Sequence, residues 1–338
     1  MLNFIDKKKK NKNIKYCPYA FDSLIVLPDR TMSICKYNKY IAAKNYDEIW
    51  LDIPGIIVTR KNIKKSFKES FNNLQCNNCC YCEEKEETPE IHHNEVIKNL
   101  ILSHWNYCNY NCINCTKECK TNSADTKQIY IMPAIKQLLK DNLIDKTTNI
   151  IFECGEAQLH PEFEKLFNFV SAYEFNSITI HTNGQLFSKE IADSIAQGMT
   201  KIIINIDAAG EYIYNKVKGI NKYNDVLQNV EHYKMYEPPK QTSIILKYTM
   251  INGITDNQQG IVDFFIYGKE IGIKKFIIDI EDNWYNVQII PEHFDSNLKK
   301  LIEYTIELSK INNYEIELSP KLKYLDKIRI ATSFYRNR

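Results

Sequence analysis

Residues 177–206 read SITIHTNGQLFSKEIADSIAQGMTKIIINI, and this stretch decides the fold. A strand pattern at Ser177–Thr182 leads into an amphipathic segment, Lys189–Gly198, and then into the apolar run Lys201–Ile206, which is typical of a buried strand. Two strands joined by a helix lie parallel in one sheet, because parallel neighbours need a helical crossover. The sequence therefore predicts an α/β fold built on a parallel sheet.

The same alternation of apolar runs and amphipathic segments continues on both sides of this stretch. Six strand–helix units fall short of the eight of a closed barrel, so we expect a partial (β/α)6 barrel of TIM type. In such sheets the chemistry gathers at the carboxyl ends of the strands. An amphipathic helix within Pro291–Arg338 is expected to cover the open edge. The other strands are predicted at Val96–Trp105, Asn149–Phe152, Thr242–Met250 and Lys274–Ile280, and the other helices at Pro133–Asp141, Glu162–Tyr173, Tyr223–Tyr236 and Gln259–Gly272.

Composition and charge narrow the classes of function. The 338 residues suit one barrel with an appendage, and the 44% hydrophobic content supports a sizeable core. The formal net charge of +2, from 44 basic and 42 acidic side chains, gives no electrostatic case for nucleic acid or an anionic membrane. No apolar run reaches membrane-spanning length, and none follows Lys7–Lys10 as a secretory signal requires. We therefore expect a cytoplasmic protein.

Eleven cysteines need an explanation in such a protein. In a reducing compartment they indicate metal or catalytic use rather than disulfides. Cys108, Cys112 and Cys115 follow the first predicted strand within eight residues, so three thiolates can hold three corners of a cubane cluster and leave the fourth iron open. Cys119 keeps an alternative open, because four thiolates bind zinc or fill every corner of an electron-transfer cluster.

Motifs at successive strand ends resemble the radical S-adenosylmethionine (SAM) superfamily, whose signature is C-x3-C-x2-C after the first barrel strand. Residues 152–156, FECGE, are similar to the family's G-G-E-P segment, and LHPEF at 159–163 continues it. HTNG at 181–184 is similar to T-N-G, and NIDAA at 205–209 is similar to S-I-D-G/A. YNKVKG at 214–219 is similar to Y-x-x-x-R-G. The resemblance covers about residues 96–281, and an ordered set of motifs is more specific than any one of them.

The resemblance implies an enzyme that cleaves SAM reductively at a 4Fe-4S cluster, giving a 5′-deoxyadenosyl radical that abstracts hydrogen from a substrate. Cys108, Cys112 and Cys115 are the implied cluster ligands. A low-potential electron donor such as flavodoxin or ferredoxin is implied as partner. The residues implied to contact SAM are Gly155, Glu156, Asn183, Asn205, Asp207 and Lys247, and those that close the sixth strand and are expected to contact substrate are Asp279, Glu281 and Tyr285.

Three positions depart from the family pattern. Cys154 stands where the family usually has glycine, and Ala157 stands where it usually has proline. Asn114 occupies a place where an aromatic residue usually packs over SAM, and Tyr110 is a candidate to replace it. None of these changes removes a cluster ligand.

A second group of cysteines lies near the amino terminus. Residues 17–35, CPYAFDSLIVLPDRTMSIC, predict a hairpin with strands Leu24–Leu27 and Thr31–Ile34; an E-I-W segment and CNNCCYC at 76–82 follow. This order resembles a SPASM or twitch auxiliary-cluster module, here placed before the barrel. A zinc-binding module is the alternative, because four thiolates in two pairs suit zinc equally well. The ligands that the resemblance implies for a second 4Fe-4S cluster are Cys17, Cys35, Cys76 and Cys79, with Cys80 or Cys82 as alternates.

The polar stretch at 83–94, EEKEETPEIHHN, predicts a linker between the two cysteine groups. We therefore expect a cysteine-rich module at 1–94, a radical SAM core at 95–285 and a helical extension at 286–338. The expected substrate is a peptide or protein side chain, or a sugar or other small metabolite. The rival hypothesis is a non-catalytic iron–sulfur or zinc protein that transfers electrons or binds a partner.

Overall fold

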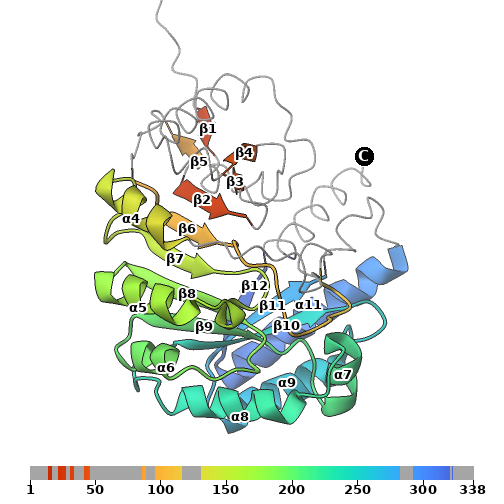
Figure 1. Ribbon diagram of the computed structural model, residues 1–338. Helices are drawn as coiled ribbons and strands as arrows, with labels where there is room; N and C mark the ends of the chain where they lie inside the picture. The colour runs from red at the N-terminus through yellow and green to blue at the C-terminus, as the bar shows by residue number, and fades with distance from the viewer. Residues whose placement is uncertain are drawn as a thin grey trace, which may run out of the picture.

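The computed structural model describes residues 14–16, 22–27, 31–33, 42–45, 86–88, 96–115, 131–281, 292–319 and Leu322. In these ranges ten strands form one open sheet, in the order β12-β11-β10-β9-β8-β7-β6-β2-β3-β4, and β1 pairs separately with β5. Figure 1 shows this sheet with helices packed along it. The strands are β1 (Ile14–Tyr16), β2 (Ser23–Val26), β3 (Thr31–Ser33), β4 (Ala42–Asn45), β5 (Glu86–Thr88), β6 (Asn99–Leu102), β7 (Asn149–Phe152), β8 (Ser177–Thr182), β9 (Thr200–Asn205), β10 (Ile244–Met250), β11 (Lys275–Ile280) and β12 (Glu315–Leu318). The helices are α4 (Met132–Lys140), α5 (Phe163–Tyr173), α6 (Lys189–Ala196), α7 (Glu211–Lys218), α8 (Tyr223–Lys234), α9 (Gln258–Glu270) and α11 (Glu292–Asn312), with a 3₁₀ turn, η3, at Ala157–Leu159.

Eight consecutive strands of the sheet, from β12 to β2, run parallel. This confirms the predicted parallel α/β fold, and the sheet stays open because β12 and β4 are its two edges in the described ranges. The six predicted strand–helix units are present, from β6 with α4 to β11 with α11, and β12 and β2 extend the parallel sheet by one strand on either side. β12 was not predicted, whereas β2 was predicted as part of a hairpin.

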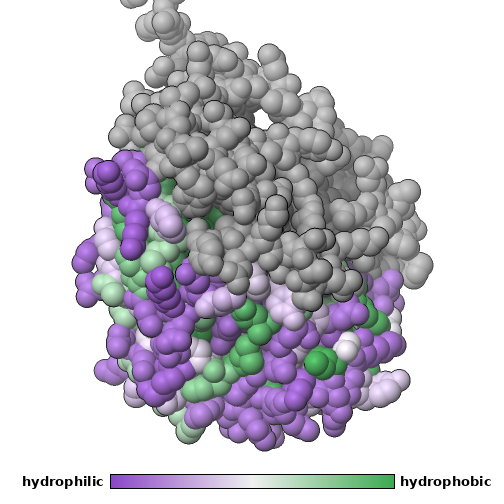
Figure 2. Space-filling model, viewed as in Figure 1, coloured by the Kyte–Doolittle hydropathy of each residue, from purple (hydrophilic) through white to green (hydrophobic). Residues whose placement is uncertain are grey.

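Alternation along the strands buries one face of the sheet beneath the helices. In β8, Ile178, Ile180 and Thr182 are buried, whereas the residues between them stay partly exposed. Apolar side chains of α4, α5, α6, α8 and α9 complete this core, and each fully buried one contributes about 1.5–3 kcal/mol. The outer surface of the molecule in Figure 2 is mostly hydrophilic where it is coloured, as expected for amphipathic helices on a sheet. No helix in the described ranges is long and apolar enough to cross a bilayer.

A row of hydrogen-bonded polar side chains crosses the opposite face of the sheet near the amino ends of four strands. Asn149 Nδ2 donates to Asn99 Oδ1 at 2.9 Å, and Ser177 Oγ donates to Asn149 Oδ1 at 2.8 Å. Asn99 Nδ2 donates to Ser23 Oγ at 3.5 Å, which extends the row to β2. These bonds support the register of β2, β6, β7 and β8, because a slip by one residue would turn the polar side chains into the core.

The amino-terminal segment joins the larger sheet through β2. The predicted hairpin is confirmed, since β2 pairs antiparallel with β3, but β2 also lies parallel to β6. The stretch predicted to be a linker contains β5, whose residues pair antiparallel with β1. The domain boundary at residue 94 stays a prediction. Because β2 pairs with β6, the segment before that boundary shares a sheet with the core.

Candidate functional site

The predicted cluster ligands lie in the loop that leaves β6 at its carboxyl end. Cys108, Cys112 and Cys115 are all partly exposed, and within the described part of the chain they form no disulfide. The backbone N–H of Cys115 donates to the carbonyl of Cys112 at 3.2 Å, which closes a turn between the two. Cys108 Sγ accepts a hydrogen bond from the backbone N–H of Tyr110 at 3.4 Å. Such N–H···S bonds stabilise a thiolate ligand.

The chemistry of this loop fits an iron–sulfur cluster. Burial raises the pKa of Cys108 to about 11, so the thiol stays protonated unless a cation offsets the charge of the thiolate. Bound iron supplies such a charge. Three thiolates on one short loop are a ligand set that can hold three corners of a cubane and leave its fourth iron open.

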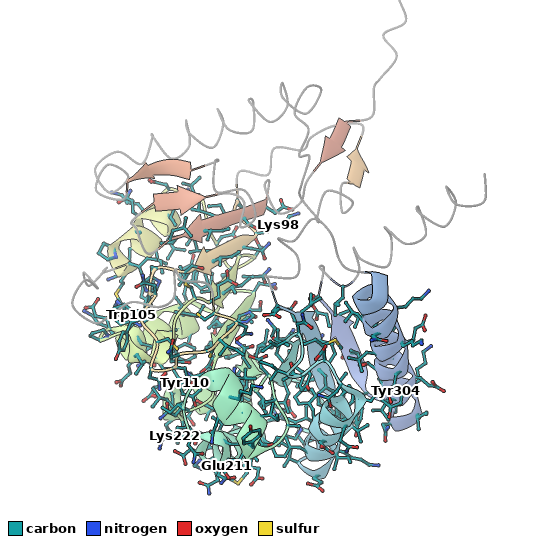
Figure 3. All side chains as sticks on the ribbon, turned by 90° about the vertical axis from the view of Figure 1, so that its right-hand side faces the viewer. Lys98, Trp105, Tyr110, Glu211, Lys222 and Tyr304 are labelled. Carbon is teal, nitrogen blue, oxygen red and sulfur yellow. The ribbon has the colours of Figure 1, made fainter. Side chains whose placement is uncertain are left out.

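The carboxyl end of α7 holds the cluster loop in place. The backbone N–H of Asn111 donates to the carbonyl of Lys218 at 3.2 Å, and that of Ile113 donates to the carbonyl of Val217 at 2.9 Å. These carbonyls belong to the last turn of the helix, where acceptors lack partners within the helix. Tyr214 Oη donates to Tyr110 Oη at 3.0 Å, and Figure 3 shows Tyr110 beside α7. Sequence reasoning missed this role of α7.

The turn after β7 packs directly against the backbone of the cluster loop. Cys154 and Gly155 both have left-handed φ angles, +71° and +58°. A Cβ on Gly155 would lie 2.6 Å from the carbonyl oxygens of Trp105 and Tyr107, so only glycine fits there. The next residue, Glu156, donates its backbone N–H to the carbonyl of Tyr107 at 2.8 Å. The predicted SAM segment and the predicted cluster loop are therefore in contact.

The Glu156 carboxylate is fully buried at this contact. It accepts hydrogen bonds from Thr182 Oγ1 and from the backbone N–H of Asn183, both at 2.8 Å, and from Gln158 Nε2 at 3.4 Å. Burial raises its pKa from 4.5 to about 7, although these hydrogen bonds act in the opposite direction. A carboxyl with this pKa can accept a hydrogen bond from an ammonium group and gains its charge most readily beside one.

Asn183 links the end of β8 to the cluster loop. Its Nδ2 donates to Asn109 Oδ1 at 2.8 Å and to Cys108 Sγ at 3.7 Å. Asn205 lies at the end of β9, and its Oδ1 is buried with no hydrogen-bond partner among the residues that the structure describes. An orphaned buried acceptor is costly, which marks Asn205 as a position that a ligand donor would complete.

The remaining predicted residues of the site are already paired. Lys247 Nζ lies 2.7 Å from Asp279 Oδ2, which joins a predicted SAM contact to a predicted substrate contact. Asp207 binds the side chains of Lys218 and Thr249. Glu281 Oε1 accepts a hydrogen bond from the backbone N–H of Asn252 at 3.0 Å. The following predicted residues lie outside the described ranges: Cys17, Cys35, Cys76, Cys79, Cys80, Cys82, Cys119 and Tyr285.

Two kinds of known sequence resemble this chain. Residues 102–265 match the radical SAM superfamily. Over 152 residues the chain is 24% identical to the GTP 3',8-cyclase of Vibrio parahaemolyticus, which covers 44% of this chain and 46% of the relative. Over 234 residues it is 26% identical to the probable GTP 3',8-cyclase of Methanococcus aeolicus, which covers 68% and 69%. The chain spans about half the length of the bacterial cyclases that it matches.

Solved structures share the fold. SuiB of Streptococcus suis bound to S-adenosylmethionine aligns with a TM-score of 0.52 at 13% identity, over 82% of this chain and 67% of that chain. SuiB bound to its precursor peptide aligns with a TM-score of 0.51 at 14% identity, over the same shares. The open parallel sheet, the ordered residues at its strand ends and the family match agree, and residues 102–265 form a radical SAM domain.

Proposed function

We propose that the chain binds a 4Fe-4S cluster through Cys108, Cys112 and Cys115 and uses it to act on a peptide or protein side chain. When bound, the cluster and SAM supply one-electron cleavage of SAM and a 5′-deoxyadenosyl radical that abstracts hydrogen from the substrate. The observation that carries this proposal is the direct packing of Gly155 and Glu156 on the cluster loop. That packing puts a buried carboxylate close to the Cys108 thiol, and this carboxylate would hold the ammonium of SAM.

The strand ends provide the groups that SAM requires. Glu156 is suited to accept hydrogen bonds from the methionyl ammonium, and Gly155 lets backbone approach closely. The orphaned Oδ1 of Asn205 is suited to a ribose hydroxyl. Lys247 is the candidate partner of the methionyl carboxylate, and Asn183 orients Asn109 and Cys108. Asp207, the sixth residue of the predicted SAM set, lies at the same edge but is engaged by Lys218 and Thr249.

Charge on the sheet face opposite the helices favours a substrate without phosphates. Lys247 pairs with Asn205, and Lys275 pairs with Ile245, which lies two residues before Lys247 on the same strand. Paired residues, and alternate residues of one strand, share a face of the sheet, so both lysines lie on this face. Lys247 pairs with Asp279, and Lys275 pairs with Glu315 at 2.6 Å and with Glu317 at 3.5 Å. Residues 61–328 contain no arginine, the side chain best suited to phosphate recognition.

This pattern favours a peptide over a nucleoside triphosphate such as GTP, whose cyclases resemble the chain over part of its length. Precursor-peptide binding by the structural neighbour SuiB is consistent with that choice. A sugar or other uncharged metabolite is the second candidate. We further propose a second 4Fe-4S cluster at the amino-terminal cysteines, a low-potential donor of the flavodoxin or ferredoxin class as reductant, and a cytoplasmic location.

Anaerobic reconstitution with iron and sulfide, followed by dithionite reduction in the presence of SAM, tests the proposal. The wild-type protein is expected to form 5′-deoxyadenosine, and a Cys112→Ser variant is expected to form none, because one cluster ligand is lost. Wild-type protein with intact clusters and no SAM cleavage would support the non-catalytic rival instead.

Iron and sulfide analysis separates the two proposed clusters. Two cubanes hold about eight irons per chain, so the Cys108/Cys112/Cys115→Ala variant is expected to retain about four. Retention of zinc in place of iron by that variant would assign the amino-terminal cysteines to a zinc module. Loss of all metal would leave a single cluster.

A further inference from the structure

A buried ion pair lies directly behind the cluster loop. Lys218 Nζ donates to Asp207 Oδ2 at 2.6 Å, and the two side chains are only 2% and 6% exposed. Thr249 Oγ1 donates to the other carboxylate oxygen, Asp207 Oδ1, also at 2.6 Å. Each oxygen of Asp207 therefore accepts one hydrogen bond from within the protein, which holds the carboxylate in a fixed orientation.

The same pair connects the cluster loop to the strand ends. Lys218 is the last residue of α7, and its carbonyl accepts the N–H of Asn111, which lies between Cys108 and Cys112. Asp207 follows β9 with a left-handed φ of +56°, and its backbone N–H donates to the carbonyl of Lys247 on β10 at 3.2 Å. Lys218 thus touches the loop with its backbone and the strand ends with its side chain.

Close packing reinforces this connection. A Cβ on Gly219, the residue after Lys218, would lie 2.8 Å from the carbonyl oxygen of Asn111. Burial disfavours the Lys218 ammonium, but its attraction to Asp207 and then to Cys112 outweighs this, so the pKa of Lys218 is raised. The ammonium is therefore held charged beside Asp207.

We propose that Lys218 and Asp207 are positioning residues of the cluster site, which fix the loop of Cys108, Cys112 and Cys115 against the ends of β9 and β10. This inference rests on the proposed cluster. Outer residues that orient metal ligands typically change metal affinity by about 10–100-fold when they are removed. The pair acts in this way through the backbone of α7 and not by touching substrate or SAM.

The test compares how fast a chelator strips iron from the reconstituted cluster in several variants. Lys218→Met and Asp207→Asn are each expected to lose iron about tenfold faster than wild type. The double variant is expected to be no worse than either single variant, because the two residues act as one unit. Lys218→Arg keeps a donor and a positive charge at the same place and is expected to restore the rate to within about threefold of wild type.

Two controls separate positioning from stability. Lys222→Met removes an exposed ion pair with Asp225, 39% and 50% exposed, and should leave iron loss unchanged. Asn149→Ala lowers stability at the amino ends of β6, β7 and β8, away from the cluster loop, and should also leave iron loss unchanged. The reduced cluster of Lys218→Met should give a more heterogeneous electron paramagnetic resonance signal than that of Asn149→Ala, although both proteins melt at lower temperature.

The outcomes distinguish this inference from the proposed function. Iron loss from Lys218→Met at the wild-type rate, or no restoration by Lys218→Arg, overturns the positioning role while the cluster stands. Wild-type protein that takes up no cluster overturns both. If Lys218→Met does not fold, Thr249→Val provides the test, because it removes one hydrogen bond to Asp207 and keeps both charges. That variant should lose iron about threefold faster, and a wild-type rate would overturn the inference.

Discussion

Replacing Gly155 with alanine tests whether the turn after β7 packs directly on the cluster loop. The new Cβ would lie 2.6 Å from the carbonyl oxygens of Trp105 and Tyr107. Because both are backbone atoms, relief requires a shift of the loop that leads to Cys108. The residue also has a φ of +58°, a conformation that costs an L-amino acid about 1–2 kcal/mol.

Gly253 provides a matched control for this substitution. Its φ is +67°, and a Cβ there would meet nothing within 4 Å. Gly253→Ala should therefore cost about 1 kcal/mol, for the conformation alone. Gly155→Ala adds the overlap with two carbonyls, and overpacking of this kind costs about 1–3 kcal/mol, so the total loss should be about 2–4 kcal/mol.

Urea unfolding of the cluster-free proteins gives both free energies of unfolding, and iron analysis after reconstitution reports on the loop. Gly155→Ala should lose about 1–3 kcal/mol more than Gly253→Ala and should retain less iron. Equal losses of stability in the two variants, with full iron in both, would refute the direct packing of Gly155 on the loop.

Three further substitutions make smaller tests of the same site and fold. The first is Glu156→Gln, which removes an ionisable group. In the wild-type protein burial raises the pKa of the Glu156 carboxyl from 4.5 in the unfolded chain to about 7 in the folded protein, so this carboxyl ionises at lower pH in the unfolded chain. Wild-type stability relative to that variant should fall as the pH rises from about 4.5 to about 7, by at most about 3 kcal/mol; a constant difference in urea unfolding would contradict this. Cys154→Gly should stabilise the protein by about 1 kcal/mol, because it relieves a φ of +71°, and it should keep its iron; loss of iron would make Cys154 a ligand. Asn149→Ala should lower the free energy of unfolding, followed by thermal unfolding, by about 2 kcal/mol, because Asn99, Asn176 and Ser177 each lose a hydrogen bond to Asn149. An unchanged stability would show that the polar row does not support the strand register.

The core of the fold was predictable because its strands are long or strongly apolar. All six predicted strands and the helices between them are present, and the run KIIINI gives the central strand β9. The places of the two further parallel strands in the sheet were not predictable. β12 reads EIEL within the segment predicted as a helical extension, and its place is decided by pairing with β11. β2 was predicted, but only as part of a hairpin, and hairpin residues alone do not show that its second edge meets β6.

The positions of the site residues were predictable, but their partners were not. The ordered motifs place Glu156, Asn183, Asn205 and Asp207 at strand ends, and the structure puts them there. Sequence order does not show which side chains bond to one another across the sheet. Lys218 illustrates this, because its partner Asp207 lies eleven residues earlier, and only the fold of α7 against β9 brings the two together. The lysine at the arginine position of Y-x-x-x-R-G was the one available signal.

Cys154 shows that the turn after β7 is imposed by its surroundings. A cysteine at φ +71° is strained, and glycine, which the family usually has here, is not. The strain persists because the next two residues are fixed from outside, Gly155 by the carbonyls of Trp105 and Tyr107, and Glu156 by Thr182 and the backbone of Asn183. The contacts that hold the Glu156 carboxylate beside the cluster loop must therefore outweigh a backbone penalty of about 1 kcal/mol at Cys154. The left-handed conformation is thus set by the contacts of Gly155 and Glu156 and not by the residue type at position 154.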